Sequence, residues 1–224
     1  MRRIIVVAAI LVMLPAAGCR QAKEAAREQY YTALEKVGLE KREVLVKRVD
    51  NAREAQQKAE RQFRDALEEF KALVDYRGGE LESRYEKLRG EYEDAKQRAD
   101  TVHDKIRAVK NVATALFKEW ETEIGKYTNA EMKRTSQREL AETRKRYEQL
   151  VVVMERAASR MDPVLAKLQD QVLFLKHNLN AKVLGSLQTT AVSLETDVDA
   201  LIRDMEASIR EADAFIKDME GAAK

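Results

Sequence analysis

The sequence predicts an all-α protein, an elongated antiparallel coiled-coil bundle of about four long helices. Its 224 residues include only eight glycines and two prolines, too few turn-forming residues for a β-sandwich, a β-barrel or an α/β enzyme. Charged residues make up 36% of the chain, and abundant Ala, Glu, Lys, Leu and Arg favour long helices. The single cysteine excludes a disulfide framework and a cysteine-rich metal site.

The N-terminus is typical of an export signal. Two arginines precede an apolar run from Ile4 to Leu14, which is shorter than the roughly 20 residues that a membrane-spanning helix needs. The following Ala16-Ala17-Gly18-Cys19 resembles the bacterial lipobox, in which the cysteine thiol is acylated and cleavage makes it the first residue. We therefore expect a signal peptide over 1–18 and lipidation of Cys19. An ordinary secretory signal with an incidental free cysteine is the alternative.

The residues after Cys19 indicate where the protein is held. Lipoproteins retained at the inner membrane tend to carry aspartate at the next position, whereas this chain has Arg20, which favours the outer membrane. We expect a protein of the bacterial cell envelope, lipid-anchored and facing the periplasm, with a short tether over 19–28. Arg20, Lys23 and Arg27 would either touch anionic headgroups or form a solvated linker.

Charge balance argues against a nucleic-acid partner. The whole chain has 41 basic and 39 acidic residues, and Arg2 and Arg3 leave with the signal, so the remainder carries 39 of each. A net charge of zero gives no general attraction for a polyanion.

Heptad spacing predicts the helices that follow. Apolar residues recur at alternating steps of three and four within 45–73, 81–120, 140–161 and 194–219. This 3.5-residue period keeps one stripe facing a partner helix along a left-handed supercoil. Gln56 is the one polar residue of the first stripe. We expect a single helical bundle domain over 29–224, whose charged outer faces hold pairs such as Glu54–Lys58 and Asp213–Lys217.

The few breakers predict the turns. Gly38 separates a short leading segment from the first long helix, and the run 75–79 ends that helix, because paired glycines accept left-handed conformations. Gly125 closes the second helix, and Thr128 or Asn129 caps the third.

Two later boundaries stay open at this point. Asp162-Pro163 fits either a helix start or a kink inside a continuing helix. Antiparallel pairing places a third reversal within 176–188, where Asn178, Asn180 and Gly185 are weak breakers. Fewer, longer rods are the alternative to four helices.

The sequence contains no recognisable catalytic or cofactor-binding motif. Neither His103 nor His177 has an acidic or histidine partner three or four residues away in a ligand pattern, and Gly78-Gly79 does not belong to a phosphate-binding loop. We therefore expect no enzyme activity, no cofactor and no metal.

Two segments are candidate partner-docking sites. Four consecutive apolar residues, Val172 to Leu175, exceed what one helix stripe requires, so we expect them to be buried on several sides. Polar residues follow at once, which fits either a core segment entering a turn or a docking patch at the tip of the bundle. That candidate patch consists of Phe174, His177, Asn178 and Asn180. Trp120 is the second candidate, although core packing explains it more simply.

Several strings carry a family resemblance: Leu116 to Glu121 (LFKEWE), Leu175 to Ala181 (LKHNLNA) and Asp199 to Ile216 (DALIRDMEASIREADAFI). Together with Glu35 to Gly38 and Lys41 to Val46, they resemble an uncharacterised family of predicted proteobacterial lipoproteins, catalogued as a domain of unknown function. The resemblance covers essentially the whole chain after the signal. It implies an envelope lipoprotein of helical coiled-coil type, with no known activity or site to transfer.

The function that this pattern favours is a lipid-anchored periplasmic scaffold or interaction protein, bound to the membrane through its anchor and to envelope proteins or a second copy of itself. The alternative is a binding module that opens to take up an acyl chain or another apolar ligand. Methionine and phenylalanine in the stripes, such as Met154 and Phe63, would allow such a site.

Overall fold

The computed structural model describes residues 40–221. Its helices are α2 (Lys41–Val74), α3 (Leu81–Ile124), α4 (Ala130–Asn178), α5 (Ala181–Ser186) and α6 (Gln188–Gly221). No strand occurs within this part of the chain. The all-α fold class is thus confirmed, with four long helices and one short helix. Residues 29–39 of the expected domain, the tether and the signal fall outside the described residues.

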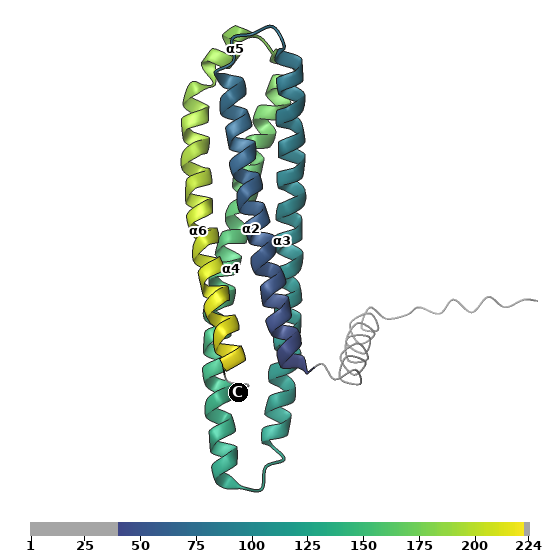
Figure 1. The fold of residues 1–224 in the computed structure, drawn as a ribbon, viewed down its shortest axis with the longest axis vertical. Coiled ribbons are helices and arrows are strands. Elements are labelled where there is room, and N and C mark those ends of the chain that lie inside the picture. The colour runs from purple at the N-terminus through teal and green to yellow at the C-terminus, as the bar shows by residue number, and fades with distance from the viewer. Residues whose placement is uncertain (1–39, 222–224) are drawn as a thin grey trace, which may run out of the picture. The chain divides into compact units, whose positions relative to one another are not determined.

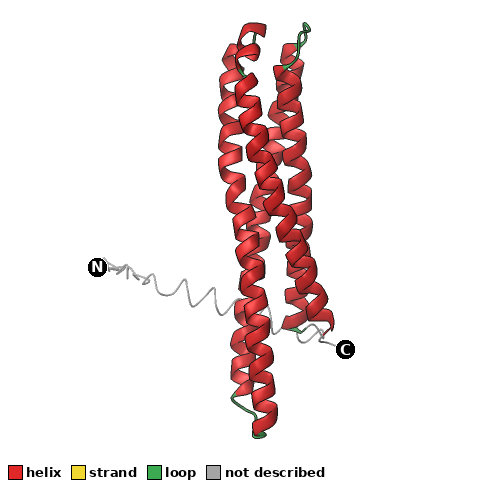
Figure 2. Cartoon of the chain, turned by 90° about the vertical axis from the view of Figure 1, so that its left-hand side faces the viewer, coloured by secondary structure: helices red, strands yellow, loops and turns green. Residues whose placement is uncertain are grey.

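The four long helices run up and down beside one another (Figures 1 and 2). Ion pairs identify the neighbours: Lys87 of α3 meets Glu69 of α2, and Lys71 of α2 meets Glu195 of α6. On the other side, α4 packs against both α3 and α6. Helices α2, α3, α4 and α6 therefore occupy successive corners of an antiparallel four-helix bundle.

The heptad stripes form the core, as the spacing predicts. In α2, Leu45, Val49, Phe63 and Phe70 are all fully buried, and the same holds for Leu150, Met154 and Met161 of α4. Small residues at the same period, such as Ala59, let the helices approach closely. The core is a continuous narrow column along the bundle axis, flanked by exposed charged faces.

Unequal helix lengths give the bundle an open end. Helices α2 and α6 have 34 residues each, whereas α3 has 44 and α4 has 49. At the α5 end all four helices meet, but at the other end the α3–α4 hairpin continues past the first residues of α2 and the last residues of α6 (Figures 1 and 2). From Glu142 back to Ala130 this hairpin projects by about 20 Å, at 1.5 Å per residue.

The predicted turns within residues 40–221 are confirmed, with one change of mechanism, whereas the predicted break at Gly38 lies outside the described residues. Helix α2 ends at Val74, and the side chain of Asn129 caps α4 by accepting hydrogen bonds from the backbone N–H groups of Glu131 and Met132. The expectation of a left-handed conformation at the glycine pair was wrong, since the φ angles of Gly78 and Gly79 both lie outside that region. A Cβ at Gly78 would meet the ring of the half-buried Tyr76, which would have to shift.

Pro163 lies inside α4, which runs without interruption from Ala130 to Asn178. The helix start at Asp162-Pro163 was therefore wrong, and the continuing helix was the correct alternative. Pro163 is exposed, and the heptad stripe passes it through Met161, Val164 and Leu168, all of which are buried. Burial of that stripe outweighs the local cost of the proline.

The third reversal falls where antiparallel pairing predicts it. Helix α4 ends at Asn178, the short α5 follows, and α6 begins at Gln188. Asn180 caps α5 by accepting a hydrogen bond from the Val183 N–H. None of the helices in the described range 40–221 is long and apolar enough to cross a bilayer.

One buried polar pair interrupts the core. Gln56 of α2 and Ser208 of α6 are both fully buried, and the Ser208 hydroxyl donates a hydrogen bond of 2.8 Å to Gln56 Oε1. Gln56 Nε2 has no protein partner. A polar pair at one level of an otherwise apolar column fixes the register of α2 against α6, because any slip would leave both groups buried without a partner.

We expect Ser208→Ala to lower the free energy of unfolding by about 1–3 kcal/mol, because Gln56 then loses its remaining partner. The double variant Gln56→Leu/Ser208→Ala should be at least as stable as the wild type, since neither polar group remains. Urea unfolding of the wild type, both single variants and the double variant measures the coupling. Additive effects would show that the pair does not act as a unit.

Candidate functional site

A cavity lies at the open end of the bundle, where α2 begins and α6 ends against the side of the α3–α4 hairpin. It has a volume of 330 Å³. Its lining combines apolar surface with both signs of charge: Arg42, Trp120, Glu139, Glu142, Thr143, Arg146, Phe215, Asp218 and Met219. Arg146 forms an ion pair of 2.9 Å with Asp218, which joins α4 to α6 at this level. Apolar surface with paired charges at its rim suits the binding of a side chain or a peptide.

Trp120 is held in place at this cavity. Its indole Nε1–H donates a hydrogen bond of 2.8 Å to the hydroxyl of Ser136 across the hairpin, and the residue stays partly exposed. Beside it, the rings of Phe117 and Tyr147 meet edge to face, with centroids 5.3 Å apart. The guanidinium of Arg144 covers the Phe117 ring at 5.1 Å. The base of the hairpin is therefore an aromatic cluster with a fixed tryptophan at its edge.

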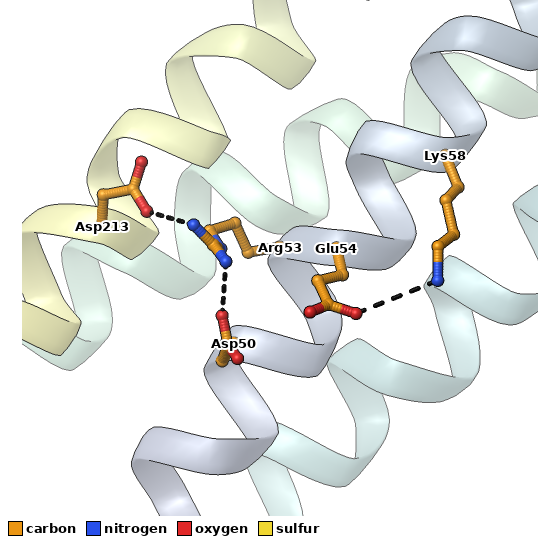
Figure 3. Close-up of polar contacts among 5 residues, drawn as sticks. All are labelled: Asp50, Arg53, Glu54, Lys58 and Asp213. Atoms are coloured by element: carbon orange, nitrogen blue, oxygen red, sulfur yellow. Dashed lines mark hydrogen bonds and ion pairs between the residues drawn. The ribbon is translucent and has the colours of Figure 1, made fainter.

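A second, more open groove runs between the start of α2 and the end of α6, with a volume of 660 Å³. Val46, Ile216 and Met219 give it an apolar floor, and Arg53 crosses its wall. The Arg53 guanidinium binds Asp50 of its own helix at 2.6 Å and Asp213 of α6 at 2.8 Å (Figure 3). The hydrogen bond to Asp213 raises the pKa of Arg53. Arg42 donates a hydrogen bond of 2.8 Å to the Met219 carbonyl and separates this groove from the cavity.

The exposed pairs follow the sequence prediction only in part. Glu54 and Lys58 lie 3.9 Å apart on the surface of α2, as expected (Figure 3). The expected pairing of Asp213 with Lys217 was wrong, because Asp213 binds Arg53 across the helix interface. An interhelical partner is closer to the carboxylate than a lysine one turn along the same helix.

Tyr147 gives the base of the hairpin a pH dependence. Burial, with smaller effects from Glu155 and Glu148, raises the pKa of its phenol from 10.0 to about 12. The phenol therefore ionises at a lower pH in the unfolded chain than in the folded protein. The contribution of the neutral phenol to the free energy of unfolding is complete below pH 10 and is lost as the pH rises from about 10 to about 12. We expect Tyr147→Phe to remove about 1–2 kcal/mol of this alkaline destabilisation.

Unfolding curves of the wild type and Tyr147→Phe between pH 8 and 12 test this. The difference in free energy should be constant at the lower end and change only at the alkaline end. An unchanged difference across the whole range would show that the phenol ionises as readily in the folded protein as in the unfolded chain.

The predicted docking residues lie at opposite ends of the bundle. Phe174, His177, Asn178 and Asn180 gather where α4 ends, whereas Trp120 lies at the open end. The structure therefore does not bring the two candidates together. Cys19 lies outside the described residues.

The expected burial of the segment from Val172 to Leu175 was wrong. Val172 and Leu175 are buried, but Leu173 is 55% exposed and Phe174 is 45% exposed. One stripe of α4 faces the core, so the two middle residues point away from it. The asparagines that follow have local roles: Asn178 donates to the Phe174 carbonyl, and Asn180 caps α5.

His103 has a partner that helix spacing did not show. Its Nε2 lies 3.3 Å from Asp162 Oδ1 on α4, which links two neighbouring helices at the surface. Within the described residues there is no group of three or more His, Cys, Asp or Glu side chains that would hold a metal ion.

The comparison with protein families shows to which family the chain belongs. A family described as "Protein of unknown function (DUF2959)" matches residues 30–219. The chain belongs to the DUF2959 family. That match spans all the described helices up to Met219, so the bundle with its open-end cavity is the DUF2959 domain of this chain. No curated protein and no solved structure matches the chain.

Proposed function

We propose that this DUF2959 protein is a lipid-anchored, non-enzymatic helical scaffold of the bacterial cell envelope, which holds or spaces partner proteins in the periplasm. The observation that carries the proposal is the combination of two features. One is the lipobox-like sequence ending at Cys19, and the other is a bundle whose core is a continuous heptad column. Such a column makes a stiff rod, about 70 Å long in α4 at 1.5 Å per residue.

Both ends of the rod offer surface for partners. The open end has the cavity beside Trp120, with mixed charges at its rim. The α5 end presents the exposed Phe174 and Leu173. A rod with separate contact surfaces at its two ends suits a protein that spaces two partners, because neither surface needs the bundle to open.

The alternative, a carrier of an acyl chain, has less support. The residues that would line an internal site, such as Met154, Met161 and Phe63, are fully buried between the helices. A ligand of that size would have to displace this packing, and each large side chain removed from such a core costs about 2–5 kcal/mol. We therefore propose the scaffold alone.

The anchor is tested by Cys19→Ser. Without a thiol, no diacylglyceryl group is attached, so we expect the variant to leave the membrane fraction or to keep its signal. Fractionation of cells and the intact mass of the purified N-terminal peptide measure both effects. The wild type should carry the mass of the acyl groups on Cys19.

Ser186→Ala is a matched control, because it changes a single small residue, which is exposed, and leaves the anchor alone. It should fractionate with the wild type. A wild-type protein whose Cys19 carries a free thiol would contradict the lipid anchor, whatever its location.

A further inference from the structure

The α3–α4 hairpin and the first residues of α2 lie at the same end of the bundle. The first residues of α2 and the loop between α3 and α4 lie toward the same end of the bundle, and α5 lies at the other (Figures 1 and 2). Arg42 of α2 lines the same cavity as Trp120 and Glu142 of the hairpin. The first residues of α2 therefore lie at the hairpin end of the bundle (Figure 1).

The tip of the hairpin exposes apolar side chains that no other helix covers. Tyr127 in the loop is 40% exposed, and Met132 in the first turn of α4 is 55% exposed. They are two of the six exposed large apolar side chains of the described residues. An exposed tyrosine and methionine with lysines beside them, here Lys126 and Lys133, are typical of a segment that lies at a membrane interface.

The outer face of the hairpin is basic. Arg134, Arg138 and Lys145 follow one another at helix spacing along the exposed side of α4. Arg134 and Arg138 line a shallow hollow of 560 Å³, whose one acidic lining residue is Glu131. Lys118 and Lys126 are exposed on the α3 side. This face offers several guanidinium and ammonium groups to an anionic phosphate.

Some acids of the hairpin have other contacts, whereas Glu123 and Glu131 are exposed near its tip. Glu139 and Glu142 line the cavity that faces α2 and α6, and Glu121 pairs with Arg144 at 2.8 Å. At the α5 end the exposed bases Arg77, Lys176 and Lys182 are matched by the exposed acids Asp75, Glu80 and Glu82. An anionic surface therefore favours the hairpin end over the α5 end.

We propose that the hairpin end rests on the anionic headgroups of the bilayer that holds Cys19, through Arg134, Arg138 and Lys145, with Tyr127 and Met132 at the interface. This inference depends on the lipid anchor of the proposed function. The chain from Cys19 to Arg42 reaches at most about 80 Å when extended, at up to 3.6 Å per residue, so the tether is long enough. The contact orients the rod, with its α5 end and Phe174 held away from the membrane toward partners.

The test uses the anchored protein in vesicles. Cys19 is the one cysteine of the chain and is acylated under the proposed function, so Thr128→Cys in the hairpin loop supplies a free thiol for a fluorophore. Gly79→Cys supplies the same label at the other end, where a Cβ has open space. Energy transfer to a headgroup-labelled lipid is measured in vesicles of phosphatidylethanolamine with phosphatidylglycerol, and in vesicles with phosphatidylcholine in place of phosphatidylglycerol.

We expect strong transfer from the Thr128→Cys label in the anionic vesicles and weak transfer from the Gly79→Cys label. Arg134→Glu/Arg138→Glu should reduce the transfer at the hairpin by about half or more, as should 0.5 M salt, because the attraction is screened beyond a few ångströms. The control Lys96→Glu/Arg98→Glu makes the same change of net charge on exposed residues in the middle of α3 and should leave the transfer unchanged.

Equal transfer from the two labels, or equal transfer in the two kinds of vesicle, would overturn the orientation. So would loss of transfer in the control but not in the hairpin variant. The mass of the N-terminal peptide is read on the same sample. An acylated protein without the hairpin contact overturns this inference alone, whereas a protein without acyl groups overturns the proposed function together with it.

Discussion

Phe63→Asp is expected to unfold the bundle. Phe63 is fully buried in the heptad column of α2. Removing a buried phenylalanine side chain costs about 3–5 kcal/mol, and a carboxylate without a partner in the same place adds to this. Because a domain is stable by only about 5–15 kcal/mol, the variant should lose most or all of its stability. Thermal unfolding followed by circular dichroism at 222 nm measures the loss.

The matched control is Glu54→Gln, nine positions earlier on the same helix. Glu54 lies on the exposed face and contacts Lys58 at 3.9 Å. Pairs of this kind contribute a few tenths of a kcal/mol, so the melting temperature should stay within about 1–2 °C of the wild type. Equal melting temperatures for Phe63→Asp and Glu54→Gln would contradict the coiled-coil bundle.

Pro163→Ala is expected to stabilise the protein. Proline in a helix interior is about 3 kcal/mol less favourable than alanine, because it lacks a backbone N–H and crowds the preceding turn. Alanine restores a donor for the carbonyl of Ser159, four residues earlier in α4. The unfolded chain has more conformational freedom with alanine than with proline at this position, and this entropy offsets about 0.4–1 kcal/mol of the gain. The net gain should be about 2 kcal/mol in urea unfolding.

Gln169→Ala is the control for this variant. Gln169 is exposed on the same helix, and its replacement by alanine changes the helix propensity only slightly. It should alter the stability by less than about 0.5 kcal/mol. A Pro163→Ala variant that is less stable than the wild type would mean that the proline fits a local distortion on which the packing of α4 depends.

The fold followed from local features of the sequence. Heptad spacing identified which residues are buried, since a stripe such as Leu150, Met154 and Met161 has to face another helix. The few breakers identified the turns, and Asn129 caps α4 as its side-chain chemistry predicts. Both signals depend on residues a few positions apart, so a single sequence contains them.

Other features depend on contacts between distant helices. The single-sequence pattern could not choose between a break and a continuation at Pro163, because the outcome depends on how much of the α4 stripe is buried by α3 and α6. It misplaced Phe174, because a run of apolar residues does not show that only one side of the helix is covered. The preference of Asp213 for Arg53 depends on an interface between residues 160 positions apart.

The open-end cavity was also missed, although its signal is present. The predicted helices already differ in length, and two long helices next to two shorter ones must leave part of their inner faces uncovered at one end. What the lengths do not give is the lining, in which Trp120 meets residues from the first turn of α2 and the last turns of α6. Predicting which residues line the cavity requires the register of all four helices relative to one another.

Site-specific crosslinking in cells tests the scaffold most directly. A photoreactive amino acid replaces Glu139 at the cavity beside Trp120, Phe174 at the α5 end, and the exposed Arg98 in the middle of α3 as a control, each in the protein with its native anchor. Mass spectrometry identifies what each position captures. A scaffold predicts a reproducible envelope protein from the cavity or from the α5 end and none from Arg98. Crosslinks only within the chain or between its copies, together with a co-purified lipid, would contradict the scaffold and favour a carrier of an apolar ligand.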